Sequence, residues 1–572
     1  MIFICLVSYV LGMYLRTTQR RNADGSVVRY HQLAENVWDP ERGCAVARVV
    51  YNFGRAEQLD GQVLRRLAAS ILRVAGDGTA QAAEPASEVK LHRSWPYGGV
   101  WVLSQLWSEL GVQQLLLKQA PRRRKATKLV QGIFAMVANR ALDPYSKLHC
   151  WEQWLTEEVF LPEAWELELH HLYLGMDLLE RHKVELEKGV YFAMADLMNA
   201  DVDLVFYDTT SLHFEIDGED ESTLQRRGRQ YPAQRKWGKA KNRRDDVPQV
   251  IVGLAVTREG LPVRSWVFPG NTADVTTVER VKQDLRGWRL GRCVFVGDAG
   301  MNSEQNRQRL ALGGGKYILA TKIRGGDEVT KQVLTRAGRY QEVADNLRVK
   351  EVIVGDGERR RRYVLCHNPR EEQRQREHRA RIVHTLEAEL ASLRQTEGEC
   401  HSKRACELRT SERFGRYLRT TAGGRLELDR SAVKAAERYD GKWVVTSNDD
   451  TLTAEDLALG YKQLMRVEQC WRQLKGGLRL RPVFHYRPWR IHAHVTLTVF
   501  ALLLERIAEL RAGDTWRNLR DQLAAIKVIE YEHAGARIRQ TTELEPHTKA
   551  LLKRLKVAPP PTIHTVQPAG QS

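Results

Sequence analysis

A change of hydrophobic period near residue 202 constrains the fold of this chain more than any other feature. Residues 99–199 carry apolar side chains three and four positions apart, which predicts helices. The run VDLVFYDTTS that follows is short and almost continuously apolar, as expected of a strand buried on both faces. Four more strand-like runs follow, and helical patterns separate the last three: QVIVGLAVT, LPVRSWVF, CVFV and KYILAT. This order predicts an α/β fold with a mixed sheet covered by helices.

The strand and helix order is interrupted between residues 326 and 448. This stretch contains a predicted hairpin, VKEVIVGDGERRRRYVLC, a charged helix that begins after Asn368, and the strand KWVVTS. We therefore expect an inserted α+β subdomain that divides the α/β core into residues 201–325 and 449–535. Residues 491–510 are apolar nearly all round, which indicates a helix buried behind the sheet.

The remaining segments lie at the two ends of the chain. Residues 1–12 are apolar but shorter than the roughly 20 residues that span a bilayer, so we expect an over-extended start or a disordered end. Residues 13–88 predict a small sheet of two or three strands, a helix and a linker, and residues 89–200 a helical segment. Residues 536–572 are expected to be a tail, and its proline-rich end to be disordered.

One helix is expected over residues 453–477. Thr453 and Asp456 have capping-box spacing, and two glycines end the pattern. Glu468 and Lys475 share one face of this helix with the apolar side chains of Leu457, Leu464 and Trp471 and with Tyr461. An unpaired buried charge costs several kcal/mol, so Glu468 needs a partner. That partner is either a metal ion or Lys475 in a salt bridge.

Two aspartates follow apolar runs of the predicted sheet. Asp208 comes after VDLVFY and Asp298 after CVFVG, so both side chains leave the same sheet edge if these strands are parallel neighbours. A single aspartate in such a place is more often a turn former or a helix cap. Together with Glu468, the two aspartates form an oxygen-rich site of the kind that Mg²⁺ or Mn²⁺ prefers. Two such ions can activate water and stabilise the leaving oxygen of a phosphodiester.

The chain carries a formal net charge of +18, which indicates a polyanionic partner without separating DNA from RNA or an anionic membrane. Two stretches hold Lys and Arg without any acidic residue. Residues 222–244 hold nine, among them Arg235, Lys236, Lys239 and Lys241, and residues 472–490 hold six, among them Arg472, Lys475, Arg479 and Arg481. Basic stretches interleaved with aromatic residues and flanking a carboxylate cluster favour a polynucleotide substrate. The eight cysteines form no CxxC pair, which favours a reducing, cytoplasmic compartment.

Four motifs are similar to those of a known family. They are YDTTSLHFE (207–215), GLPVRSWVFPGNTAD (260–274), VFVGDAGMNS (294–303) and the helix at 453–477. Together they resemble the bacterial insertion-sequence DDE transposases, whose catalytic domain has the ribonuclease-H-like fold. The helix is similar to the Y-x2-R-x3-E-x6-K signature of the IS-four-like branch, although Leu464 occupies the arginine position and Arg466 lies two residues later. PYSKLHCWEQWL (144–155) and RPVFHYRPWRIHAH (481–494) also resemble the family.

The resemblance implies a function and a site. Asp208, Asp298 and Glu468 would be catalytic residues that bind two Mg²⁺ (or Mn²⁺) ions, and Tyr461, Arg472 and Lys475, with Arg466 near them, would contact DNA phosphates. The enzyme would cleave DNA at transposon ends and join the freed 3′-OH to target DNA. Residues 13–200 would bind the terminal inverted repeats. A homodimer associated with the bacterial nucleoid, without a membrane, is expected.

Two other functions fit the same residues. One is a ribonuclease-H-like endonuclease that does not pair two transposon ends. The other is a catalytically silent DNA-binding descendant of a transposase. The presence of all three carboxylates argues against the second.

Overall fold

The computed structural model describes most of the chain, in two compact units of residues 1–89 and 90–572. The described residues are 13–21, 27–39, 42–56, 64, 67, 68, 70, 71, 74, 89–120, 126–198, 203–239, 241, 244–286, 288, 293–324, 328–395 and 398–568. The expectations for residues 1–12, for the linker at 75–87 and for most of the helix at 57–74 therefore lie outside the described residues.

The first unit contains a three-stranded antiparallel sheet. Its strands pair in the order β1-β2-β3: β1 (Met13–Arg21), β2 (Val27–Asp39) and β3 (Cys44–Arg55). This confirms the small sheet predicted near the N-terminus. Most of its apolar side chains are exposed, Trp38 and Tyr51 among them, while Val28 and Ala34 are buried. The sheet has little core of its own.

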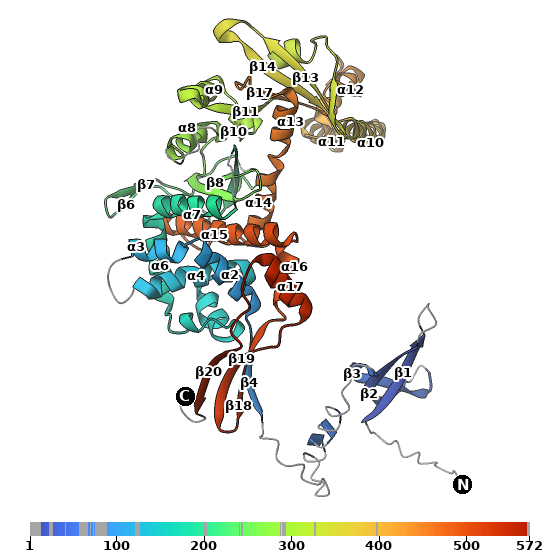
Figure 1. Cartoon of the computed structure of the whole chain (residues 1–572). Helices are drawn as coiled ribbons and strands as arrows, with labels where there is room; N and C mark the ends of the chain where they lie inside the picture. The colour runs from blue at the N-terminus through green and yellow to red at the C-terminus, as the bar shows by residue number, and fades with distance from the viewer. Residues whose placement is uncertain are drawn as a thin grey trace, which may run out of the picture. The chain divides into compact units, whose positions relative to one another are not determined.

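A nine-stranded mixed sheet, drawn in the upper part of the second unit in Figure 1, is the largest sheet of the described residues. Five strands in the order β9-β8-β5-β10-β11 make up its first half: β5 (Leu204–His213), β8 (Gln249–Val256), β9 (Pro262–Pro269), β10 (Val294–Gly297) and β11 (Lys316–Thr321). The first three strands pair antiparallel, and β10 runs parallel to both β5 and β11. Helices α8 (Asp274–Asp284) and α9 (Glu304–Ala311) make the crossovers. The predicted mixed sheet is confirmed.

Residues 326–448 are less separate from the core than an inserted subdomain was expected to be. Their strands extend the same sheet beyond β11 in the order β17-β14-β13-β12: β12 (Gln341–Ala344), β13 (Leu347–Val354), β14 (Arg361–His367) and β17 (Lys442–Ser447). Pairing with β17 satisfies the backbone groups that β11 would otherwise expose at a sheet edge. The strands of the predicted insertion therefore continue the core sheet, a pairing that the sequence did not predict.

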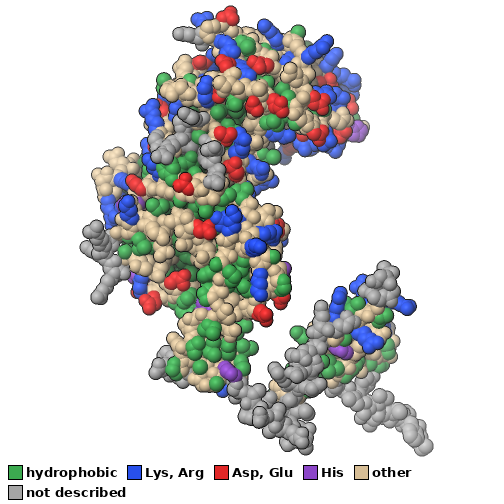
Figure 2. Space-filling view, viewed as in Figure 1, with side chains coloured by type: hydrophobic (Ala, Val, Ile, Leu, Met, Phe, Trp, Pro, Cys, Tyr) green, Lys and Arg blue, Asp and Glu red, His purple; other side chains and the backbone are tan. Residues whose placement is uncertain are grey.

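The helical part of this stretch has a small core of its own. It consists of α10 (Pro369–Leu393), α11 (Gly398–Thr410), α12 (Arg430–Glu437) and the short strands β15 (Leu418–Thr420) and β16 (Leu426–Leu428). Four apolar side chains of α10, Ile382, Leu386, Leu390 and Leu393, are buried here with Leu408 and Tyr417. The Asn368 side chain accepts a hydrogen bond from the Glu371 amide and so caps α10, as predicted. Lys, Arg, Asp and Glu side chains intermingle over these helices (Figure 2).

A helical layer packs around α15 (Pro488–Ala512) on the side of β9 (Figure 1). Its main helices are α2 (Gly98–Glu109), α3 (Val112–Gln119), α4 (Ala126–Leu142), α6 (Leu169–Arg181) and α7 (Lys183–Met198). Among the described residues α15 is the one helix long and apolar enough to cross a membrane, and 89% of its most apolar window is buried inside the protein. The helix predicted behind the sheet is confirmed. Residues 90–198 thus belong to the same packed unit as the sheet.

A second sheet joins both ends of this unit, in the order β20-β19-β18-β4. Its strands are β4 (Lys90–Pro96), β18 (Lys527–His533), β19 (Ala536–Thr541) and β20 (Ile563–Pro568), and α17 (Pro546–Leu555) connects the last two. The prediction of a tail over 536–572 was wrong. α17 buries Leu551, Leu552 and Leu555, and β20 pairs along β19, so this segment has both a core and hydrogen-bond partners despite its prolines.

The helix predicted over 453–477 is two helices, α13 (Ala454–Lys462) and α14 (Met465–Lys475). Its start is as predicted, because Thr453 and Asp456 form the capping box. The break is a tighter turn in which the amides of Leu464, Arg466 and Val467 bond to carbonyls three residues earlier. This turn shifts the face that α14 presents, so Val467, Cys470, Trp471 and Leu474 are buried while Glu468 is exposed. The buried stripe predicted for Glu468 was therefore wrong.

Candidate active site

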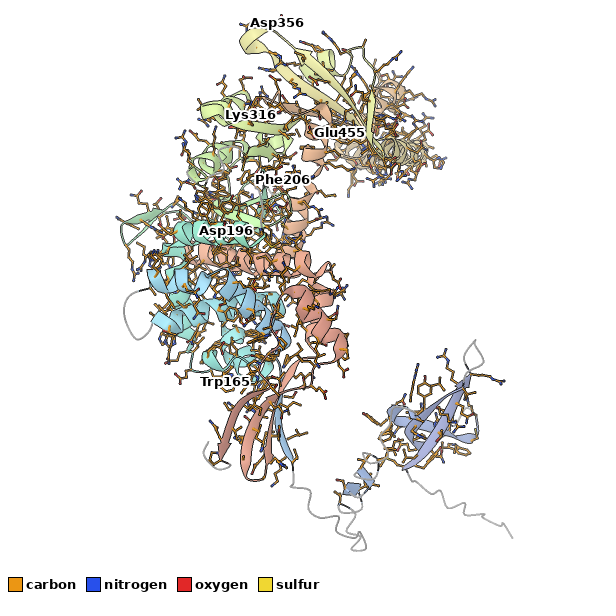
Figure 3. All side chains as sticks on the ribbon, in the orientation of Figure 1. Trp165, Asp196, Phe206, Lys316, Asp356 and Glu455 are labelled. Atoms are coloured by element: carbon orange, nitrogen blue, oxygen red, sulfur yellow. The ribbon has the colours of Figure 1, made fainter. Side chains whose placement is uncertain are left out.

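The strands that lead to the two aspartates, β5 and β10, are adjacent and parallel, as predicted. The pairing of β10 with β5 ends at Gly297 opposite Tyr207, so Asp298 and Asp208 are each the next residue along their chains. β5 itself continues to His213 because β8 pairs with it beyond this point. Asp208 consequently lies within a strand, two residues after Phe206, which Figure 3 labels. Both side chains start from the same edge of the parallel pairing.

Asp208 is partly buried and has two polar neighbours. The indole Nε1 of Trp471 donates a hydrogen bond to its Oδ2 across 3.2 Å, and the ammonium of Lys241 lies 3.7 Å from its Oδ1. Burial raises the pKa of Asp208; Lys241 opposes that shift, and the charges of Asp298 and Asp274 add to it. The carboxyl thus holds its proton more tightly than an exposed aspartate, and other acidic groups lie close to it.

Asp298 caps a short 3₁₀ turn, η4 (Ala299–Met301). Its Oδ1 accepts a hydrogen bond of 2.6 Å from the Ala299 amide, and the side chain is exposed. The capping role that the sequence left open is therefore real. The hydrogen bond from Ala299 occupies one carboxylate oxygen of Asp298 and fixes the orientation of this side chain at the sheet edge.

Tyr461 lies near enough to all three predicted catalytic carboxylates for their charges to affect its pKa. It lies at the end of α13, where Gly460 allows the helix to approach the sheet; a Cβ there would lie 3.2 Å from Cδ1 of Ile318. Burial raises the pKa of Tyr461, and the charges of Asp298, Glu468 and Asp208 raise it further, in that order. Carboxylates from β5, the end of β10 and α14 therefore act on one phenol group.

The alternative salt bridge of Glu468 is not formed. No ion pair joins Glu468 to Lys475 in the part of the chain that the structure describes, although the two residues lie on the same helix. Lys475 is influenced by Asp208 instead: burial lowers its pKa, Arg481 lowers it further, and Asp208 opposes both. The ammonium of Lys475 therefore lies nearer to Asp208 than to Glu468 in its electrostatic effect.

The spacing of the three carboxylates bears on metal binding. Within the described ranges, one group of at least three His, Cys, Asp or Glu ligand atoms lies within 4.8 Å of one another, and it is Glu168, His170 and His171 at the start of α6. The carboxylate oxygens of Asp208, Asp298 and Glu468 therefore do not all lie within 4.8 Å of one another. Their donor atoms are all carboxylate oxygens, the ligands of hard divalent cations.

Three further residues contribute to this site: Lys241, Thr209 and Asp274. The sequence predicted no role for Thr209 or Asp274. The ammonium of Lys241 lies 3.0 Å from Oδ2 of Asp274 and donates to both the carbonyl and the hydroxyl of Thr209, at 2.7 Å each. The Thr209 hydroxyl donates in turn to Oδ1 of Asp274. Asp274 is the last residue of the motif at 260–274. Its place in that motif was the feature of the sequence that could have indicated its role in the site.

The basic residues predicted to contact DNA have different surroundings. Arg235 donates to Asp220 across 2.9 Å and Lys236 to Glu219 across 2.9 Å, so acidic residues just before the basic stretch already compensate these two charges. The others are exposed or half-buried: Lys239, Arg466, Arg472 and Arg479 are exposed, and Lys475 and Arg481 are half-buried. Arg466 also bonds to Gln469 across 3.3 Å.

Comparisons with known proteins bear on this arrangement. The family model described as "Transposase DDE domain" matches residues 213–504, more than half of the chain, and includes Asp298 and Glu468; Asp208 lies just before its start. The model described as "IS1634 family transposase, N-terminal domain" matches residues 15–84. A solved structure, the piggyBac transposase synaptic complex with hairpin DNA, is similar at 9% identity and a TM-score of 0.34, over 75% of this chain and 79% of that one. A comparison with curated proteins found no match.

Proposed function

The chain belongs to the insertion-sequence transposases with a DDE domain, and on this premise we propose that Asp208, Asp298 and Glu468 are its catalytic carboxylates. Membership in this family makes it a DNA transposase that uses divalent metal ions to cleave DNA and transfer strands. The observation that best supports the three residues is the hydrogen bond from Trp471, one turn after Glu468, to Asp208, because it brings the helix of Glu468 to the paired strands that lead to Asp208 and Asp298. We further propose the IS-four-like branch.

The three proposed ligands offer carboxylate oxygens, which Mg²⁺ prefers, and we propose that they hold two such ions. Bound there, the ions would supply an activated water and charge stabilisation for the leaving oxygen. Trp471 orients Asp208 through its indole hydrogen bond, and the capping amide of Ala299 orients Asp298. The protonated hydroxyl of Tyr461 would donate a hydrogen bond to a DNA phosphate beside the carboxylates.

Positive groups beside the carboxylates would hold the DNA phosphates. Lys475 lies near Asp208 and Arg481 lies near Lys475, while Arg472 and Arg479 are exposed on α14 and just after it. Lys239 and Arg466 would add outer contacts. Arg235 and Lys236, with their charges compensated, would position the 222–244 segment and contribute little direct affinity.

The assembly we propose follows from the reaction. Joining both ends of an element to target DNA requires two active sites, so at least a homodimer would hold the double-stranded ends. The match of residues 15–84 to a transposase N-terminal domain supports recognition of the terminal inverted repeats by the first unit.

The test uses the full chain and a plasmid that carries its coding region with native flanking DNA. Asp208→Asn, Asp298→Asn and Glu468→Gln should each reduce Mg²⁺-dependent cleavage about a thousandfold or more, because the ions supply several kcal/mol of transition-state stabilisation. Gel-shift affinity for the same DNA should change little, because phosphate contacts dominate binding. Asp203→Asn is the matched control, since Asp203 precedes β5 and its side chain is exposed.

Two outcomes would contradict this assignment. Normal cleavage by the Asp298→Asn protein would exclude that residue from the site. A wild-type protein that binds the DNA but never cleaves it in Mg²⁺ or Mn²⁺ would favour the catalytically silent descendant.

A further inference from the structure

Exposed aromatic side chains are unevenly distributed over the second unit. Among its described residues four Phe, Tyr or Trp side chains are exposed, namely Tyr145, Trp237, Phe484 and Tyr486. Phe484 is 73% exposed and Tyr486 63%. Both belong to the loop at residues 476–487, which follows α14, and Tyr145 lies against the same loop. Exposing such large apolar rings to water is unfavourable, so a cluster of them indicates a binding partner.

The base of this loop is held by buried cations. Arg140 donates to the carbonyls of Arg479 and Tyr145, at 3.1 Å each, and its second contact with the loop is the Leu478 carbonyl at 3.4 Å. These bonds join α4 and Tyr145, at the start of the motif at 144–155, to residues 478 and 479, just before the motif at 481–494. The aromatic side chains therefore project from a fixed base.

A second buried contact strengthens the same junction. His494 lies 2.9 Å from the Leu480 carbonyl through Nε2 and 2.9 Å from the Lys147 ammonium through Nδ1. A carbonyl only accepts, so Nε2 carries the proton and Nδ1 accepts from Lys147. Both side chains are buried. Such an arrangement fixes three consecutive backbone positions of the loop, residues 478–480.

Arginines surround the exposed rings. The Arg479 guanidinium lies 5.3 Å from the Tyr145 ring centre, and that of Arg487 lies 5.6 Å from the ring of Tyr486. With Arg481, the loop carries three arginines and no acidic residue. A docking surface for a protein would pair an apolar centre with a mixed polar rim. Aromatic rings on a loop that carries arginines and no acidic residue instead match the bases and phosphates of nucleic acid.

The loop also borders the carboxylate site. It follows α14 directly, and Trp471 of that helix touches Asp208. Arg481 is near enough to Lys475 and to His213, the last residue of β5, to lower the pKa of both. Bases of the strand whose phosphate lies among the carboxylates would therefore reach the loop.

We propose that Phe484 and Tyr486 form a stacking site for unpaired DNA bases next to the cleaved phosphate. The ligand is a nucleobase of single-stranded or locally opened DNA. Any of the four bases can bind, because every base has an aromatic face. The site rests on the action of this chain on DNA and not on the assignment of the metal ligands. A second copy of the chain is the competing occupant.

The experiment measures binding of the full chain in EDTA to two probes. One is a duplex with a short unpaired bubble that contains the fluorescent base 2-aminopurine, and the other is the same duplex fully paired. Wild type should bind the bubble more tightly and quench its fluorescence. Phe484→Ala and Tyr486→Ala should each weaken bubble binding about tenfold and leave paired DNA nearly unchanged. Leu312→Ala, at an apolar side chain that is 63% exposed elsewhere, should change neither.

Conservative variants separate stacking from apolar docking. Tyr486→Trp should retain the bubble preference and the quenching, whereas Tyr486→Leu, which keeps an apolar side chain, should lose both. Equal binding by Tyr486→Leu and wild type would overturn the proposal. Light scattering on Phe484→Ala and Tyr486→Ala tests the competing occupant. If these variants lose the dimer mass but keep the preference for the bubble, the proposal is overturned in favour of a contact between two copies of the chain. Asp208→Asn should quench like wild type, so the stacking site and the metal assignment can fail separately.

Discussion

The indole nitrogen of Trp471 donates a hydrogen bond to Oδ2 of Asp208 across 3.2 Å and joins residues 263 positions apart. Trp471 lies one turn after Glu468 on α14, and Asp208 lies on β5. This single bond therefore ties the helix that carries the proposed third ligand to the strand that carries the first. Trp471 is also buried, so its ring packs the helix against the sheet at the same point.

Two replacements of Trp471 should separate its hydrogen bond to Asp208 from its packing against the sheet. Trp471→Phe keeps much of the packing and removes the hydrogen bond, so cleavage should fall about tenfold with DNA affinity unchanged, because a bond to a charged group is worth about 1.5–3 kcal/mol. Trp471→Ala should also lower the free energy of unfolding by about 3–5 kcal/mol. Cleavage rates and urea unfolding check both, with the half-exposed Trp237→Phe as control. A fully active Trp471→Phe enzyme would show that the bond does not position Asp208.

The pKa of Asp208 gives a stability prediction with a definite sign. Burial raises it above its ordinary 3.8, so the folded protein binds this proton more tightly than the unfolded chain. The stability that the protonated group contributes is present below pH 3.8 and is lost as pH rises through the raised folded value. Asp208→Asn mimics the protonated form, so without metal it should have a higher Tm than wild type at neutral pH.

Thermal scans in EDTA across pH test this directly. The difference in Tm between Asp208→Asn and wild type should shrink towards low pH, and Mg²⁺ should raise the Tm of wild type more than that of the variant. Asp203→Asn, at an exposed carboxyl, should track wild type throughout. A Tm below wild type for Asp208→Asn at neutral pH would mean that the ionised carboxylate stabilises the fold.

Lys241 should compete with metal ions for the carboxylates. Its ammonium lies 3.0 Å from Asp274 and 3.7 Å from Asp208, so a cation entering there must overcome its charge. Lys241→Met should bind Mn²⁺ about fivefold more tightly and Asp274→Asn about fivefold more weakly, given about 1 kcal/mol for a partly exposed pair. Titration calorimetry measures both. Lys236→Met, whose lysine pairs with Glu219, is the matched control, and unchanged affinity in Lys241→Met would remove Lys241 from the site.

Features set by adjacent residues were predictable from the sequence. KYILAT and KWVVTS are strands at their predicted bounds, and the caps at Asn368 and Thr453 form as expected, because each depends on a few neighbouring residues. The pairing of the strands before Asp208 and Asp298 was predictable from their apolar runs and parallel connection. The convergence of the two aspartates followed from this.

Features set by distant partners were not predictable in the same way. The break between α13 and α14 changes hydrogen bonds by one residue and leaves the apolar pattern intact, so the exposure of Glu468 was missed. The pairing of β20 with β19 and the compensation of Arg235 by Asp220 depend on turns that composition does not reveal. Asp274 acquires its neighbours only when α8 packs beside β5.

Arg140 should stabilise the loop after α14. Arg140→Ala would leave the carbonyls of Leu478, Arg479 and Tyr145 without this donor, and we expect a loss of about 3–5 kcal/mol in the free energy of unfolding. Urea unfolding measures it. Arg419→Ala, which removes an exposed pair with Glu427, should cost no more than about 1 kcal/mol. Equal stability of the two variants would mean that the loop is held without Arg140.

Removal of the first unit should abolish sequence preference and preserve catalysis on bound DNA. The unit ends at residue 89, whereas residues 90–198 pack into the second unit, where β4 pairs with β18. A chain of residues 90–572 therefore keeps its cores intact, and a cut near residue 200 would not. It should retain salt-sensitive binding to any DNA but lose about a thousandfold or more of its preference for the DNA flanking its own coding region, because phosphate contacts carry no sequence information. Competition gel shifts against random DNA measure this, and an undiminished preference would place end recognition within the second unit.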